Sequence, residues 1–353
     1  MTSSEVTIPT TIEQVTPEWL SDALGRSVTS IVTEPVGVGV GLVGQLFRAR
    51  MECGGEPTTI IVKLAAATEA DRFVATVLNM YGREVGFYTE LSERTAISHP
   101  ACYFATHDPV TQDSVLLLED VSIRGRARDQ IAGHSLADAR PAIRTLARLH
   151  ACFWDDPALA DSSFLRRLCA DPYPAAVGMA YDLAWPRVQE LFGDMVDDRV
   201  REFGDGYSKR IPGLFAKLCE GPLVLSHSDW RLDNLFFTDD DDVIAIDWQL
   251  IDRSVGPRDL SYHVTQSVNI DDPAGYTHAF DTYVSDLADL GVDVDPVWAW
   301  EAYRYGTMLG FVYPVIASGA ITIANDRHAE LCRALFRRSL AALDALDAFA
   351  LPV

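Results

Sequence analysis

Lysine is scarce in this chain of 353 residues, whose 29 basic residues comprise three lysines and 26 arginines. The 51 acidic residues give a formal net charge of −22. Because affinity for the phosphate backbone of nucleic acids rests mainly on Lys and Arg, this balance argues against a nucleic-acid-binding protein. One of the three lysines, Lys63, stands inside the apolar run Ile60–Ala65, which makes it a candidate functional residue.

The six cysteines are scattered, and no two of them have the C-x-x-C spacing of zinc knuckles and redox motifs. The N-terminus lacks the basic and apolar regions of a signal peptide. A long uncharged run lies between Arg304 and Asp326, but prolines and glycines interrupt it and no basic cluster flanks it. We therefore expect a buried core segment there, and a cytoplasmic protein with no membrane, nucleic-acid or obligate protein partner.

Hydrophobic residues make up 48% of the chain, and their distribution predicts two regions of different structure. Apolar runs predict strands in the first region at residues 30–36, 45–51, 58–64, 101–105 and 114–119. Helical spacing predicts one long helix over residues 69–93. From Asp138 onward the pattern is mainly helical, with one β-rich block over residues 223–248. The expected fold class is α+β, with a small β-rich N-terminal lobe (1–120) and a larger helical C-terminal lobe (121–353).

A glycine-rich segment containing Gly39, Gly41 and Gly44 follows the first predicted strand. In dinucleotide-binding folds the G-x-G-x-x-G spacing opens a helix. Here it opens the strand over residues 45–51, so the context of a dehydrogenase is missing. A glycine loop between antiparallel strands covers the phosphates of ATP in kinases, and the alternative is a flexible hairpin turn. The segment alone leaves both interpretations open.

Lys63 falls near the end of the third predicted strand, 19 residues after Gly44. A lysine on an otherwise apolar strand is costly to bury without a charged partner, and Glu84 on the following helix is the natural one. In phosphoryl transfer such a lysine contacts the α- and β-phosphates, while a glutamate holds it in place. The alternative is an edge-strand lysine whose amine reaches water.

The most specific pattern is H-x-D-x-x-x-x-N, formed by His227, Asp229 and Asn234, followed by two short apolar strands and Asp247. A tight turn between the strands would bring Asn234 and Asp247 to one end of a hairpin, where an amide oxygen and a carboxylate can bind one Mg²⁺. Asp229 could then accept or orient an attacking hydroxyl. We expect His227 to fix the backbone of this loop and Asp259 to anchor it.

At these positions the sequence resembles the small-molecule kinases of the aminoglycoside phosphotransferase, choline kinase and ecdysteroid-kinase-like group, which share a protein-kinase-like two-lobed fold. The resemblance extends over roughly residues 30–310. It is carried by His227–Asn234, with Ser228 where many members have glycine, by Ile246–Gln249, and by Arg83–Tyr88, which is especially like the ecdysteroid-kinase branch.

The resemblance implies ATP and Mg²⁺ as cofactors. It implies Asp229 as the catalytic residue, Asn234 and Asp247 as metal ligands, and Lys63 with Glu84 at the phosphates. Leu116–Val121 is similar to the hinge whose backbone holds adenine. The implied ATP-binding residues are therefore Gly39, Gly41, Gly44, Lys63, Glu84, Glu119, Asp120 and Val121.

The expected activity is the ATP-dependent phosphorylation of a small-molecule hydroxyl, because the His-Arg-Asp, Asp-Phe-Gly and Ala-Pro-Glu motifs of protein kinases are missing. Aromatic residues of the second region favour a partly apolar, neutral or singly charged alcohol as acceptor, although about half of them could be core. These residues are Trp248, Trp298, Trp300, Tyr303, Tyr305, Phe311 and Tyr313. The alternatives are an aminoglycoside phosphotransferase and a regulatory, nucleotide-binding pseudokinase; a dinucleotide oxidoreductase is a distant third.

Overall fold

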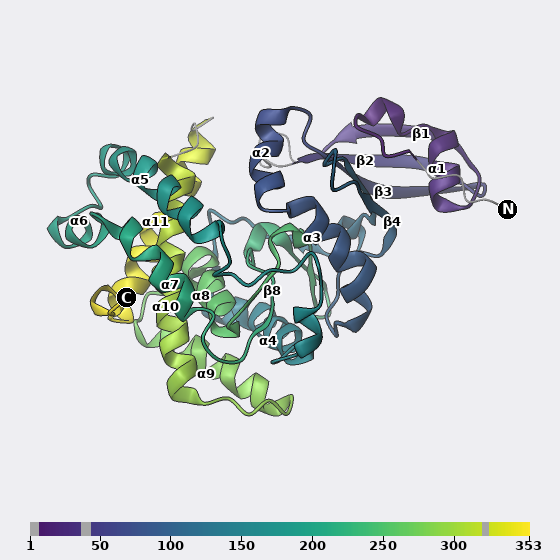
Figure 1. The fold of residues 1–353 in the computed structure, drawn as a ribbon. Helices are drawn as coiled ribbons and strands as arrows, with labels where there is room; N and C mark the ends of the chain where they lie inside the picture. The colour runs from purple at the N-terminus through teal and green to yellow at the C-terminus, as the bar shows by residue number, and fades with distance from the viewer. Residues whose placement is uncertain (1–6, 37–43, 320–324) are drawn as a thin grey trace. The chain divides into compact units, whose positions relative to one another are not determined.

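The structure is a computed structural model that describes residues 7–36, 44–319 and 325–353 (Figure 1). The chain divides into two compact units. The first unit contains Met1–Gly125 and the short segment Ile246–Leu250, and the second contains Arg126–Ala245 and Ile251–Val353. Because the short segment returns to the first unit, Asp247 belongs with the N-terminal strands and not with the rest of the β-rich block.

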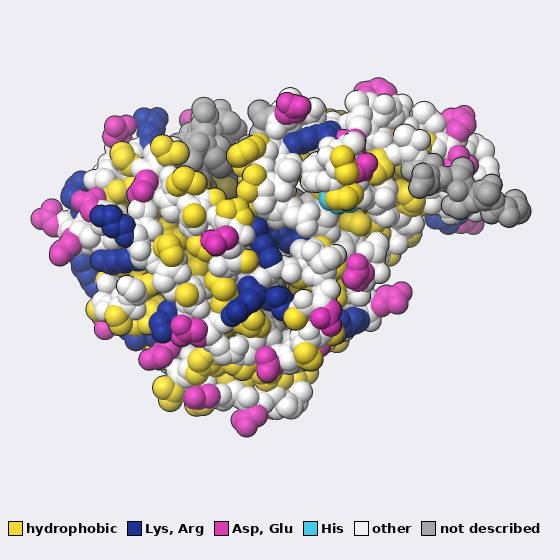
Figure 2. All heavy atoms as spheres, viewed as in Figure 1, with side chains coloured by type: hydrophobic (Ala, Val, Ile, Leu, Met, Phe, Trp, Pro, Cys, Tyr) yellow, Lys and Arg dark blue, Asp and Glu magenta, His cyan; other side chains and the backbone are white. Residues whose placement is uncertain are grey.

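On the face of the molecule that Figure 2 shows, the acidic side chains are spread out and not gathered in one area. Figure 2 shows acidic and basic side chains interspersed across one face, with hydrophobic side chains scattered between them. Among the described residues of this face, no extended area carries charge of a single sign. This distribution is typical of a surface whose charge serves solubility.

The first unit is built on a five-stranded antiparallel sheet with the strand order β1-β2-β3-β5-β4. The strands are β1 (Val28–Pro35), β2 (Gly44–Cys53), β3 (Glu56–Ala65), β4 (Cys102–His107) and β5 (Ser114–Glu119). All five expected strands are therefore present. The register places Lys63 in the central strand, opposite Leu46 on β2 and Leu116 on β5.

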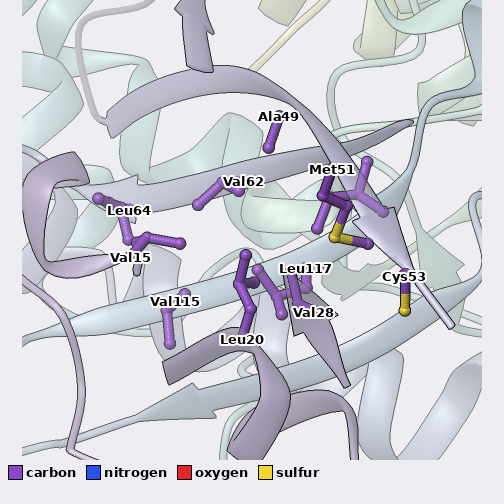
Figure 3. Packing of buried hydrophobic residues seen from close by; sticks show 11 residues of the cluster. Val15, Leu20, Val28, Ala49, Met51, Cys53, Val62, Leu64, Val115 and Leu117 are labelled. Carbon is purple, nitrogen blue, oxygen red and sulfur yellow. The ribbon is translucent and has the colours of Figure 1, made fainter. Parts of the chain in front are cut away.

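A hydrophobic core covers one face of this sheet (Figure 3). Successive side chains of a strand point to opposite faces of the sheet. On β3 the buried side chains Ile60, Val62 and Leu64 point to this core, so Lys63 points to the other face. Helix α1 (Pro17–Leu24) contributes Leu20, whose side chain is fully buried. Thr16 is the N-cap of α1, because its side-chain oxygen accepts a hydrogen bond from the backbone nitrogen of Trp19.

The segment between β3 and β4 is not the single helix that the sequence predicts over residues 69–93. It forms two helices, α2 (Glu69–Val77) and α3 (Met80–Gly86), followed by a π-helical turn over Phe87–Leu91. The break lies at Asn79, whose φ of 50° is left-handed and cannot continue a right-handed helix. Glu84 remains on α3.

The second unit is mainly helical. Its helices are α4 (Leu136–Cys152), α5 (Tyr173–Leu191), α6 (Asp198–Gly204), α7 (Ile211–Lys217), α8 (Gly256–Ser267), α9 (Ala274–Asp289), α10 (Pro296–Gly319) and α11 (Asp326–Ala345). The uncharged run becomes most of α10, which packs against α5, α8 and α11 and is largely buried. Within the described parts of the chain, no helix is long and apolar enough to span a membrane.

Short strands of the second unit organise the loops around the H-x-D-x-x-x-x-N pattern. They are β6 (Arg126–Ala127), β7 (His134–Ser135), β8 (Val224–Ser226), β9 (Leu235–Phe237), β10 (Val243–Ala245), β11 (Asp252–Ser254) and β12 (Val268–Asn269). β9 and β10 form the expected antiparallel hairpin, in which Leu235 pairs with Ala245. Asn234 directly precedes this hairpin, and Asp247 follows its last residue by two positions.

Candidate active site

In the first unit the structure joins Lys63 to two carboxylates. The Lys63 Nζ donates to Glu84 Oε1 at 2.8 Å and to Asp247 Oδ1 at 2.7 Å. Glu84 is buried, whereas the side chains of Lys63 and Asp247 are 16% and 25% exposed. The Lys63–Glu84 pair is the one that the sequence predicts, and the edge-strand alternative is wrong because Lys63 lies on a central strand.

The electrostatics of this group keep the lysine charged. Burial lowers the pKa of the Lys63 ammonium, but the two carboxylates outweigh it and raise that pKa above its usual value. Asp247 has a φ of 65°, a left-handed conformation that costs a non-glycine residue about 1–2 kcal/mol. Such strain is common at functional positions, where the surrounding structure holds the residue in place.

Packing fixes the segment that carries Asp247. The ring of Trp248 stacks on Phe87 with 3.7 Å between the ring centroids and 5° between the planes. Arg83 on α3 donates to the backbone oxygen of Leu250 at 3.2 Å. The segment is therefore attached to α3 and the turn after it, which also carry Glu84.

The remaining residues predicted to bind ATP are the glycines of the glycine-rich segment and the residues of the expected hinge. Gly39 and Gly41 lie outside the described residues, and Gly44 is the first residue of β2, where a Cβ would meet the Leu64 carbonyl oxygen at 3.0 Å. At the expected hinge, Glu119 ends β5.

Arginines engage both carboxylates of the expected hinge. Arg124 bonds to Glu119 at 2.6 Å, and Arg48 Nε bonds to Asp120 Oδ2 at 2.6 Å. Asp120 also caps the short 3-10 turn that starts at Val121. The contact of the hinge backbone with adenine stays a prediction.

In the second unit, three side chains donate hydrogen bonds to the buried carboxylate of Asp229. Tyr262 OH and Arg231 Nε bond to Oδ1 at 2.7 and 3.0 Å, and Asn234 Nδ2 bonds to Oδ2 at 2.7 Å. Burial raises the pKa of Asp229, but Arg231, Tyr262 and Asn234 more than compensate and hold it below its usual range. The carboxylate is therefore ionised and held in a fixed orientation.

Asn234, predicted as a metal ligand, bonds to Asp229 through its amide nitrogen. Its amide nitrogen donates to both the backbone oxygen and the side chain of Asp229 at 2.9 and 2.7 Å. This arrangement turns the amide oxygen away from Asp229 and leaves it as an acceptor. Asp247 and Asn234 each offer a hard oxygen, the ligand type that Mg²⁺ prefers. Within the described residues no cluster of three or more His, Cys, Asp or Glu side chains could hold a metal.

The loop that carries Asp229 is anchored by Asp259, as the sequence predicts. Its carboxylate accepts from the backbone nitrogens of His227 and Ser228 at 2.7 and 3.1 Å and lies 3.4 Å from His150 Nε2. Burial raises the pKa of Asp259, but the contacts with His150 and the nearby cation Arg258 prevail and lower it. His227 is fully buried and its Nδ1 faces the Asp229 backbone nitrogen at 3.3 Å, so it fixes the loop backbone.

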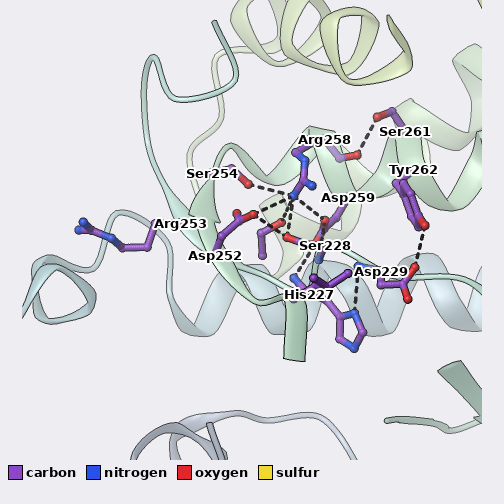
Figure 4. A network of polar contacts seen from close by, with 12 residues as sticks. His227, Ser228, Asp229, Asp252, Arg253, Ser254, Arg258, Asp259, Ser261 and Tyr262 are labelled. Atoms are coloured by element: carbon purple, nitrogen blue, oxygen red, sulfur yellow. Dashed lines mark hydrogen bonds and ion pairs between the residues drawn. The ribbon is translucent and has the colours of Figure 1, made fainter. Parts of the chain in front are cut away.

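A second network that the sequence analysis missed supports the same loop (Figure 4). Ser228 has a φ of 68° and donates its hydroxyl to Asp252 at 2.9 Å. Arg258 donates to the Ser228 hydroxyl at 2.7 Å and lies 3.6 Å from Asp252. The left-handed conformation explains physically why glycine suits this position. The only sequence signal was the serine at a position where many members of the resembled family have glycine.

The aromatic residues predicted for the acceptor site divide into different roles. Trp248, Tyr303 and Phe311 are fully buried and belong to the core, so they cannot line an open site. Trp298 instead lines a cavity of about 680 Å³ together with Trp154, Asp293 and Asp295, a set that includes no catalytic-loop residue. Tyr313 is half-buried and lies in edge-to-face contact with Tyr262. Of the predicted set, Tyr313 is thereby linked to Asp229 through Tyr262.

Comparisons with known proteins define the class of this fold. A candidate aminoglycoside phosphotransferase from Ralstonia eutropha aligns with a TM-score of 0.57 and 13% identity, over 94% of this chain and 97% of that chain. Macrolide 2′-phosphotransferase from Brachybacterium faecium aligns at 0.51 and 18%, over 95% and 97%. Choline kinase from Cryptosporidium parvum aligns at 0.53 and 12%, over 95% and 94%. The fold is thus the kinase-like fold that the sequence predicts.

The family follows from the sequence model of the ecdysteroid kinase-like family, which matches residues 39–293. The chain belongs to this family, as the resemblance in its motifs indicates. A comparison with curated protein sequences found no significant match.

Proposed function

We propose that this protein transfers the γ-phosphoryl group of ATP to a hydroxyl group of a small molecule. The observation that carries the proposal is the Asp229 carboxylate, ionised and held by Tyr262, Arg231 and Asn234 in the loop where a kinase of this family orients its acceptor. Membership of the ecdysteroid kinase-like family supports the same reaction.

In the proposed reaction the acceptor oxygen forms a bond to the γ-phosphorus while the bond from that phosphorus to the β–γ bridging oxygen breaks. The products are the phosphorylated alcohol and ADP, and the hydroxyl proton leaves through Asp229. The protein forms no covalent bond to the transferred group in this reaction. It contributes by positioning the two substrates and by neutralising the charge of the phosphates.

Lys63 has the role of a phosphate-binding cation in this proposal. Glu84 holds its ammonium, and its charge is maintained by the two carboxylates around it. Asn234 and Asp247 are proposed as the ligands of Mg²⁺, which would neutralise the charge of the phosphates when bound. Gly39, Gly41 and Gly44 are proposed to cover the phosphates, and the backbone of Glu119–Val121 to hold adenine.

The proposed acceptor is a partly apolar, neutral or singly charged alcohol. Two half-buried aromatic rings, Tyr262 and Tyr313, lie in contact beside Asp229. The relatives include both a macrolide 2′-phosphotransferase and a choline kinase, so acceptors other than aminoglycosides occur on this fold.

The first experiment is phosphorylation of a metabolite panel with ATP and Mg²⁺, read by product mass and ADP release. We expect a phosphorylated alcohol, with Asp229→Asn as the inactive control. Thermal stabilisation by ATP with Mg²⁺, and not by NAD, separates a kinase from an oxidoreductase. A pseudokinase would bind ATP without releasing ADP, and efficient phosphorylation of kanamycin-type compounds would contradict the proposed acceptor class.

A further inference from the structure

The hydroxyl of Tyr262 lies at the centre of the Asp229 environment. Tyr262 is on α8, one helical turn after the loop anchor Asp259. Its hydroxyl donates to Asp229 Oδ1 at 2.7 Å. Its ring is half-buried and contacts Tyr313 edge to face, with 5.5 Å between the ring centroids. Helix α8 thus holds the backbone of the loop through Asp259 and the Asp229 carboxylate through Tyr262.

The donors divide unequally between the two oxygens of Asp229. Oδ1 accepts from Tyr262 and from Arg231, whereas Oδ2 accepts from Asn234. A carboxylate oxygen accepts about two hydrogen bonds in its plane. Oδ1 is therefore saturated by the described residues, and Oδ2 keeps room for one further donor. The oxygen that remains available for a substrate hydroxyl is Oδ2.

We propose, on the basis of the proposed function, that Tyr262 is a positioning residue that saturates Asp229 Oδ1 and so presents Oδ2 to the acceptor hydroxyl. Tyr262 suits this role because its hydroxyl is carried by a rigid ring on a helix anchored to the same loop. Arg231 also donates to Oδ1, but its guanidinium makes a second hydrogen bond, from Nη1 to Asp233 Oδ2 at 2.8 Å. Loss of the tyrosine hydroxyl would leave Oδ1 with one donor and allow the carboxylate to rotate.

The test compares Tyr262→Phe with Tyr207→Phe. Tyr207 is a buried tyrosine of the second unit whose hydroxyl donates to the backbone oxygen of Met308 at 3.0 Å, so it is a matched hydroxyl that does not bond to Asp229. Activity is followed as ADP release from MgATP with water as acceptor. In Tyr262→Phe we expect kcat to fall about tenfold with the KM for ATP unchanged, as for the loss of a hydrogen bond to a charged group.

The split between kcat and KM separates positioning from a structural role. General damage to the fold would change kcat and the KM for ATP together, whereas a misplaced Asp229 carboxylate should lower kcat alone. In Tyr207→Phe both constants should stay at their wild-type values. A wild-type kcat in Tyr262→Phe, or an equal fall of kcat in Tyr207→Phe, would overturn the proposal.

A structural comparison keeps the proposal independent of activity. In a crystal structure of Tyr262→Phe the Asp229 carboxylate should be rotated from its wild-type orientation, whereas in Tyr207→Phe it should keep that orientation. If the wild type phosphorylates no member of the metabolite panel but the carboxylate rotates in Tyr262→Phe, the proposed function fails while the Tyr262–Asp229 link stands. If the carboxylate keeps its orientation in Tyr262→Phe, the positioning role is wrong.

Discussion

The two units hold their functional charges in opposite ways. In the first unit one cation, Lys63, lies between two carboxylates, and two of the three side chains are partly exposed. In the second unit one carboxylate, Asp229, lies among donors, and its anchor Asp259 is completely buried. The first arrangement is partly open to solvent, whereas the second is closed in by protein donors. The comparison teaches that one half of the proposed site is adjustable and the other half is fixed.

The largest effect should come from the fixed carboxylate itself. Asp229→Asn keeps the size of the side chain but removes the acceptor of the hydroxyl proton, so kcat should fall about 10²–10⁴-fold, the usual contribution of a general base. Nucleotide binding should stay near that of the wild type, measured as stabilisation by MgATP. Asp233→Asn is the matched control, since Asp233 also pairs with Arg231 at 2.8 Å but makes no bond to the reactive carboxylate. Wild-type turnover in Asp229→Asn would remove Asp229 from the mechanism.

The second prediction concerns the stability of the fixed half. Asp259→Asn leaves the buried Arg258 without one carboxylate and disturbs two backbone donors, so the free energy of unfolding should fall by about 3–5 kcal/mol. Denaturant unfolding measures this loss, and Asp281→Asn, an exposed change on α9, should cost less than about 0.5 kcal/mol.

The same carboxylate predicts the pH dependence of stability. The pKa of Asp259 is lowered in the folded state, so its stabilisation is fully present above the unfolded value of about 3.9. It is lost as the pH falls below that value toward the folded pKa. The difference between wild type and Asp259→Asn should therefore be constant from pH 5 to 8 and shrink below about pH 4. An equal difference at all pH values would contradict the assigned charge.

The third prediction tests the adjustable half. Asp247→Ala should abolish the part of the ATP-induced rise in melting temperature that depends on Mg²⁺. A ligand at a concentration of 100 Kd stabilises the folded state by about 2.7 kcal/mol, which gives the scale of the whole rise. Asp239→Ala, an exposed aspartate of the turn between β9 and β10, should leave that rise unchanged. An undiminished rise in the first variant would mean that the metal ligand is assigned to the wrong residue.

The smallest effect distinguishes backbone strain from side-chain bonding at Ser228. Ser228→Gly and Ser228→Ala both lose the hydroxyl that bonds to Asp252 and Arg258, but only alanine keeps the cost of a φ of 68°. The glycine variant should therefore be more stable than the alanine variant by about 1 kcal/mol, measured by denaturant unfolding. Equal stabilities would show that this backbone conformation carries little strain.

The sequence predicted the parts of the molecule that depend on local pattern. The five strands of the first sheet, the Lys63–Glu84 pair and the anchoring role of Asp259 follow from alternation, from the cost of burying an unpaired charge, and from motif order. It failed where tertiary contacts decide. The break at Asn79, the core positions of Trp248 and Phe311, and the bond from Tyr262 to Asp229 depend on packing between segments far apart in the chain.

The contact between Lys63 and Asp247 means that the first unit carries its own counter-ion. The ammonium neutralises the carboxylate that is proposed to bind metal, so a lone divalent cation would have to displace an internal ion pair. A nucleotide offers its phosphates to that ammonium at the same time as the metal takes the carboxylate. We therefore expect metal and nucleotide to bind as a couple, each strengthening the other by the same factor, as thermodynamic linkage requires.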